Sequence, residues 1–160
     1  MPSIDGKEYF LERAKMKLEG TYGFGSEVWS ANIHLLDLIE LGKTQEDLFL
    51  RLNERLLQLL KEISKGEATD DDFNIEIISN NKFFVKFINS KYVTSLIFKK
   101  LRDSKKISQA KVSMNLCCER TSYCQYEEGK REPSLTKFSE ILDAMGYEWN
   151  LNIQKKKITK

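Results

Sequence analysis

The stretch from Ser108 to Pro133 constrains the fold more than any other part of this 160-residue chain. Its pattern predicts two short helices that are joined by a tight turn and followed by a Gly-Lys-Arg loop ending in a proline. Ser108 suits a helix N-cap because its hydroxyl accepts hydrogen bonds from the free N–H groups of the first turn. Val112 and Leu116 lie four residues apart, so they share one inward face of the first helix.

The second of these helices has two faces of different chemistry. Tyr123, Tyr126 and Glu127 fall on one side of it. The other side carries Arg120, Thr121, Cys124 and Gln125. A row of Arg, Thr and Gln is unusual for a packed face, and it is what a helix needs to hydrogen-bond base edges in a major groove.

The charge of the chain is divided unequally between its two parts. The whole chain carries a net charge of +2. Residues 1–94 hold 12 Lys+Arg and 16 Asp+Glu, a net charge of −4, whereas residues 95–160 hold 14 and 8, a net charge of +6. A basic C-terminal part attached to an acidic N-terminal part predicts that nucleic acid binds at one end only.

The composition offers little material for catalysis or for a metal site. The three cysteines, Cys117, Cys118 and Cys124, form no CxxC pair, and their odd number argues against a disulfide framework. His34 is the single histidine. We therefore expect no catalytic residue, no metal ligand and no cofactor. With no membrane-length apolar run and no signal-peptide pattern after Met1, we expect a cytoplasmic protein without a membrane partner.

The N-terminal half predicts a small antiparallel sheet. The segment from Tyr9 allows a helix as well as a strand, but the alternation over 27–36 favours two antiparallel strands, the first of them ending near Tyr22. A third strand is expected over 37–41. Further along, the runs FNIEIIS and KFFVKFI flank Asn80-Asn81, which predicts a β-hairpin.

A long amphipathic helix separates the third strand from this hairpin. Thr44 is a good N-cap, and Asp47 follows at nearly the position of a capping box. The apolar stripe of the helix consists of Leu48, Leu52, Leu56, Leu59, Leu60 and Ile63. Its spacing of about 3.6 residues predicts a helix packed on the sheet.

The C-terminal half predicts four helices and a strand. Asn89–Thr94 is expected to be a connector, followed by a helix over 95–104 and then the two helices described above. Ser134 caps a last helix that Gly146 ends. Alternation from Tyr147 to Ile153 predicts a strand outside the helical unit. The expected domains are 1–90, an α+β unit, then 91–146, an all-α unit, and then 147–160, the strand and a basic tail.

Residues 95–147 resemble the Xre-type helix-turn-helix family, the group of lambda repressor and Cro. The resemblance is carried by Arg102, Ser108, Gln109, Val112, Leu116, the polar run 119–125, Glu127, Gly129, Lys130, Pro133 and Gly146. It implies that the second motif helix enters the major groove and that the first crosses the DNA backbone. It further implies a homodimer on a palindromic operator in double-stranded DNA.

The resemblance also implies roles for individual residues. By position, Arg120, Thr121 and Gln125 would read bases. Phosphates would be bound by Ser108, Gln109, Ser122, Lys130 and Arg131. The family's internal ion pair would fall on Arg102 and Glu127. The chain departs from the family at Cys117, where glycine is usual, and at Glu119, where serine or threonine is usual, so the operator sequence stays open.

Residues 15–63 resemble the HicB-type antitoxin domain. The resemblance is carried by VWSANI, then LIELGKTQEDL and the long amphipathic helix, although the proline-rich segments common in that family are absent. It implies a partial ferredoxin-like unit of antiparallel strands and one long helix. Such a unit would offer a dimerising surface or a binding surface for a small HicA-type toxin.

Two functions follow from these observations. The first is a sequence-specific DNA-binding transcriptional regulator, a repressor that uses the helix-turn-helix in the major groove. The second is an antitoxin that neutralises a toxin and autoregulates its operon. An enzyme has little support, because no carboxylate pair, nucleophile-base set or phosphate loop is present. Whether the dimer forms through the sheet or through the C-terminal strand stays open.

Overall fold

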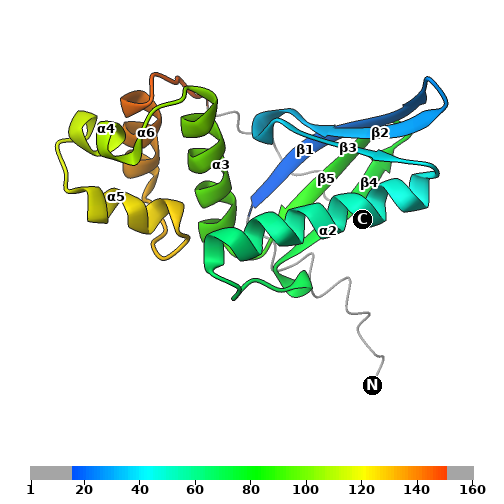
Figure 1. The fold of residues 1–160 in the computed structure, drawn as a ribbon, viewed down its shortest axis with the longest axis horizontal. Coiled ribbons are helices and arrows are strands. Elements are labelled where there is room, and N and C mark those ends of the chain that lie inside the picture. Colours follow the sequence, from blue (N-terminus) through cyan, green and yellow to red (C-terminus); the bar gives the residue numbers. More distant parts are fainter. Residues whose placement is uncertain (1–15, 151–160) are drawn as a thin grey trace, which may run out of the picture.

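The computed structural model describes residues 16–150, which form two units side by side (Figure 1). The first, residues 16–88, is a sheet crossed by one long helix, and we call it the sheet domain. The second, residues 90–150, consists of four shorter helices, and we call it the helical domain. The α+β class that the sequence predicts is confirmed.

The sheet has five strands in the order β3-β2-β1-β5-β4, and every neighbouring pair is antiparallel. The strands are β1 (Met16–Gly25), β2 (Val28–Ile33), β3 (Leu38–Gly42), β4 (Phe73–Ser79) and β5 (Lys82–Phe87). The predicted hairpin is present, since β4 and β5 pair on either side of Asn80 and Asn81. The side chains of Phe83, Val85 and Phe87 alternate with those of their neighbours and lie fully buried on one face.

The long helix α2 (Gln45–Ser64) covers that buried face. It begins where the sequence predicts, because the Thr44 hydroxyl accepts a hydrogen bond of 3.1 Å from the Asp47 backbone N–H. It joins β3 to β4, the two edge strands, and therefore crosses the whole width of the sheet (Figure 1). All six residues of the predicted apolar stripe are buried. Burying a leucine side chain stabilises by roughly 1.5–3 kcal/mol, so this stripe holds the sheet domain together.

The helical domain consists of α3 (Ser90–Ser104), α4 (Gln109–Asn115), α5 (Arg120–Glu127) and α6 (Leu135–Ala144). The side chains of Asn89, Ser108 and Ser134 cap α3, α4 and α6 by accepting backbone N–H hydrogen bonds. The two serine caps are as predicted. Glu119 occupies the N-cap position of α5 and makes no side-chain cap hydrogen bond.

Two residues after the end of each of these four helices stands a residue with left-handed backbone: Lys106, Cys117, Gly129 and Gly146. In the turn between α4 and α5 this residue is Cys117, where φ is 52° and the related proteins usually have glycine. This conformation costs roughly 1–2 kcal/mol in a residue with a side chain. The turn offsets part of that cost, because the N–H groups of Cys117 and Cys118 donate to the last free carbonyls of α4, at Met114 and Ser113.

Several element boundaries differ from the prediction. Helix α3 begins at Ser90 rather than Ser95, so most of the expected connector is helical. The reason is that Asn89 caps the helix and that Tyr92 and Val93 lie buried in the core of the sheet domain. The first strand continues to Gly25, and residues 34–36 form a 3-10 turn instead of the end of a strand.

The strand predicted over 147–153 is not formed in its described part, because residues 147–150 are irregular. Their aromatic side chains pack on the helical domain instead of alternating across a sheet. The Trp149 ring meets the Phe138 ring edge-on with 5.7 Å between centroids, and the Tyr147 hydroxyl lies 2.7 Å from Ser104 Oγ. Residues 151–153 and the basic tail lie outside the described residues.

Helix α3 takes part in both cores. Its first half places Tyr92, Val93, Leu96 and Ile97 in the core of the sheet domain, and Phe98 lies fully buried in the core of the helical domain. A single continuous helix thus fixes how the two domains are oriented toward each other (Figure 1).

A second contact joins the domains where α5 ends. Gly129 has a φ of +64°, and a Cβ at this position would lie 3.2 Å from Tyr92 Cδ1 and 3.5 Å from Ile63 Cγ2. Ile63 belongs to α2 and Tyr92 to α3, so the turn after α5 packs closely against both helices.

We expect Gly129→Ala to lower the free energy of unfolding by more than the roughly 1–2 kcal/mol that a left-handed alanine costs. The excess arises because the new methyl group presses on Tyr92 and Ile63. Gly146→Ala is the matched control, since Gly146 has a φ of +78° and no atom of residues 16–150 lies within 4 Å of its Cβ position. Chemical denaturation of both variants measures the difference, and equal losses would contradict the close contact.

Candidate nucleic-acid interface

Helix α5 separates its side chains as the sequence predicts. Tyr123 is fully buried, and Tyr126 and Glu127 are nearly so. The three predicted base-reading residues, Arg120, Thr121 and Gln125, are all exposed. The structure therefore brings these three side chains together on the solvent face of one helix.

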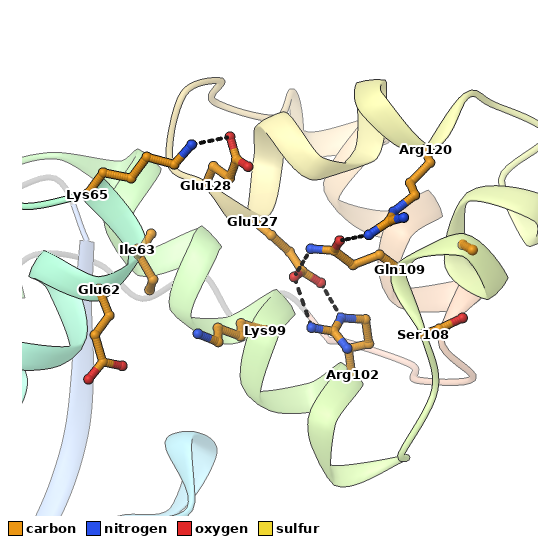
Figure 2. A pocket seen from close by; sticks show the side chains of 11 residues that line it. Glu62, Ile63, Lys65, Lys99, Arg102, Ser108, Gln109, Arg120, Glu127 and Glu128 are labelled. Atoms are coloured by element: carbon orange, nitrogen blue, oxygen red, sulfur yellow. Dashed lines mark hydrogen bonds and ion pairs between the residues drawn. The ribbon is translucent and has the colours of Figure 1, made fainter.

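The buried carboxylate of Glu127 holds this helix in place. Arg102 binds it in a bidentate ion pair, with Nε 2.5 Å from Oε1 and Nη2 3.1 Å from Oε2. The Tyr123 hydroxyl donates to Oε1 at 2.5 Å. Gln109 Nε2 donates to Oε2 at 2.9 Å (Figure 2). The main-chain carbonyl of Glu127 accepts a further bond from the buried Ser95 hydroxyl. Side chains from α3, α4 and α5 thus converge on one group.

This environment keeps the carboxylate ionised. Burial raises the pKa of Glu127, but the hydrogen bonds from Arg102, Tyr123 and Gln109 lower it by more, so the pKa lies below its ordinary value of 4.5. Burial and the bond to this carboxylate raise the pKa of Tyr123, which therefore remains a hydrogen-bond donor. The charge pair is permanent at neutral pH.

Gln109 connects the buried network to the surface. Its side-chain N–H donates to Glu127, while its Oε1 accepts from Arg120 Nη2 at 3.4 Å (Figure 2). The same oxygen accepts from Cys124 Sγ at 3.2 Å. The amide is oriented by these partners. Gln109, a predicted phosphate ligand, therefore lies directly beside Arg120, a predicted base reader.

The other predicted phosphate ligands lie around α5. Ser108 is exposed, and its hydroxyl caps α4. Ser122 is half-buried on α5. After the helix, Lys130 forms an ion pair of 2.5 Å with Glu128, and the Arg131 guanidinium lies 5.5 Å from the centre of the Tyr126 ring. Both cationic side chains remain exposed.

A polar groove of about 570 Å³ opens beside these residues, between the end of α2 and helices α3, α4 and α5 (Figure 2). Lys65 and Lys99 line it together with Ser108, Gln109 and Arg120. Neither lysine was predicted from the sequence to lie at this site. Lys99 could have been found, because it lies three residues before Arg102 and so shares its helix face. No sequence signal places Lys65 there, since it depends on how the domains pack.

Two further findings concern the described residues as a whole. Across residues 16–150, His, Cys, Asp and Glu side chains do not gather into any group that could hold a metal ion. In the same range, no helix combines the length and apolarity needed to cross a membrane.

A short helix, a left-handed turn and a second helix that presents Arg, Thr and Gln to solvent define a helix-turn-helix DNA-binding domain. Residues 98–151, about a third of the chain, match the family described as Helix-turn-helix, of the Xre or lambda repressor-like type. This part of the predicted resemblance is confirmed. The match does not extend to the sheet domain, so its resemblance to HicB antitoxins stays a prediction. A search of curated proteins gave no match.

Proposed function

We propose that this chain is a sequence-specific transcriptional regulator, a repressor that binds operator DNA through α5 in the major groove. The observation that carries this proposal is the exposure of Arg120, Thr121 and Gln125 on a helix whose inner face is fixed by a buried ion pair. A fixed helix presents its side chains in one geometry, which base readout requires. Its role is binding rather than catalysis.

The chemistry of the three side chains matches the pattern of base edges. Arginine can bind guanine through two hydrogen bonds and glutamine can bind adenine in the same way, while the threonine methyl suits the methyl of thymine. Each bidentate pair is worth roughly 1–3 kcal/mol of discrimination. The phosphate contacts position the helix: Ser108, Gln109, Ser122, Lys130 and Arg131.

Helix-turn-helix proteins of this type read two half-sites as dimers, with recognition helices roughly 34 Å apart. The sheet domain offers a surface for such a dimer. On its edge strand β3, the side chains of Ile39 and Leu41 are 61% and 51% exposed. Large apolar side chains exposed together on an edge strand are typical of a surface that another chain covers. We assign the homodimer interface to this edge.

We expect the mass in solution to be that of a dimer, both for the full chain and for a chain ending at Gly146. Light scattering after size exclusion measures it. Ile39→Lys should give a folded monomer, because it places a charge in the apolar contact. Lys43→Gln, which changes an exposed residue just beyond the same strand, is the control and should remain dimeric. A monomer for the chain ending at Gly146 would instead assign the interface to the C-terminal segment.

A second candidate function is an antitoxin that neutralises a small HicA-type toxin and represses its own operon. It is favoured by the other edge of the sheet, where Ile77 and Ile78 of β4 are 46% and 47% exposed, which leaves a surface for another protein. A small, basic reading frame next to this gene would support it. Co-purification of that product with the full chain, and its loss in Ile77→Lys, would establish the pairing.

A further inference from the structure

The groove beside α5 contains two lysines from outside the helix-turn-helix. Lys65 directly follows α2 of the sheet domain, and Lys99 lies on α3 (Figure 2). The Lys65 side chain is 67% exposed, and its nearest carboxylate, Glu128, is 3.8 Å away. Within residues 16–150, Lys99 makes no ion pair. Both charges are therefore available to a ligand.

The carboxylates that line the same groove are largely compensated. Glu127 is bound by Arg102, Tyr123 and Gln109. Glu128 is paired with Lys130, and this bond and the nearby Lys65 hold the pKa of Glu128 below its usual value. Among the carboxylates lining the groove, Glu62 is the one that pairs with no cation of residues 16–150, and it accepts a hydrogen bond of 3.2 Å from Gln58.

The groove also continues the proposed DNA-binding surface. It is bordered by Ser108, Gln109 and Arg120, two assigned to phosphates and one to a base. A backbone that follows the major groove past α5 carries one phosphate per nucleotide on each strand. The next phosphates along this backbone would lie against the side of the groove that residues of the sheet domain line.

We propose that this groove holds the sugar–phosphate backbone of one DNA strand, and that Lys65 and Lys99 bind phosphates in it. The inference rests on the proposed function, and it assigns the sheet domain a direct part in binding DNA. Because α3 runs through both cores and Gly129 packs on Ile63 and Tyr92, Lys65 is held at a fixed place relative to α5. The two domains thus form one backbone-binding surface.

The test is fluorescence anisotropy of the full chain with a labelled mixed-sequence duplex, since phosphate binding is independent of sequence. Binding is measured between about 50 and 200 mM salt. Lys65→Gln and Lys99→Gln should each lower the slope of log affinity against log salt by about 0.9 and weaken binding roughly threefold to tenfold at the lower salt. Lys43→Gln removes the same charge at the far end of α2, about 30 Å away, and should match wild type.

A variant that is expected to raise the affinity for DNA excludes misfolding as the explanation of the weaker binding. Glu62→Gln removes the uncompensated carboxylate from the groove and should tighten binding, which a damaged fold would not do. The inference is overturned if the duplex binds wild type but Lys65→Gln and Lys99→Gln behave like Lys43→Gln. If wild type binds no duplex even at the lower salt, the proposed function falls together with this inference.

Discussion

Replacing Glu127 by alanine should lower the free energy of unfolding by about 3–5 kcal/mol. The variant removes the buried carboxylate from Arg102, whose side chain is only 14% exposed, and leaves it the exposed carboxylate of Asp103 at 3.1 Å. It also removes the acceptor for the buried Tyr123 hydroxyl and for the Gln109 amide. The loss is large because three donors from three helices lose one acceptor together.

Chemical denaturation measures this loss, and Tyr123→Phe is the graded control. That variant removes one hydrogen bond to the carboxylate while keeping the ring, so we expect a loss of roughly 1.5–3 kcal/mol. If Glu127→Ala lost no more stability than Tyr123→Phe, the carboxylate would not be the shared acceptor that holds the three helices together.

The contribution of Glu127 to the free energy of unfolding should also depend on pH. Its pKa in the folded chain lies below the ordinary value of 4.5, so the ionised carboxylate stabilises the fold fully above that value. The stabilisation is lost as the pH falls through the lower, folded-state pKa. The stability difference between wild type and Glu127→Gln should therefore be constant near neutral pH and narrow only below about pH 4.5. A difference that narrows between pH 7 and 5 would contradict the assignment.

Replacing Arg120 by alanine should abolish specific operator binding and leave weak, salt-sensitive binding to any duplex. One bidentate contact with guanine is worth roughly 1–3 kcal/mol of discrimination, and a dimer would lose it in both half-sites. The expected loss is therefore about 2–6 kcal/mol, or roughly thirtyfold and more. Gel-shift titrations with an operator duplex and a scrambled duplex measure it.

Arg131→Ala is the matched control for this variant. It removes the same charge from the loop after α5, where we assign a phosphate contact. It should weaken binding to the operator duplex and to the scrambled duplex about equally, because phosphate contacts carry no sequence information. If Arg120→Ala also weakened binding to both duplexes equally, Arg120 would be a phosphate ligand and the base-reading assignment would be wrong.

The elements whose sequence signals are local were predictable. Thr44, Ser108 and Ser134 cap helices by bonds within three residues, and the apolar stripe of α2 follows from spacing alone. The two faces of α5 follow in the same way, because burial and exposure alternate along a single short helix. These features depend on neighbours in the chain, which the sequence shows directly.

Features that depend on contacts between distant segments were not predictable. Helix α3 begins five residues before the predicted start, because Tyr92 and Val93 are buried in the core that the sheet forms. Residues 147–150 form no strand because the Trp149 ring packs against the Phe138 ring on α6. Lys65 reaches the groove beside α5 only because α2 ends against Gly129. None of these contacts has a signal in the local pattern.

The most direct test of the central claim is selection of duplexes from a random library by the full chain at physiological salt, followed by sequencing. We predict enrichment of an inverted repeat whose half-sites lie about one helical turn apart, and loss of that enrichment in Arg120→Ala. A wild-type chain that enriches no sequence, or an Arg120→Ala chain that enriches the same repeat, would contradict the claim that α5 reads DNA bases.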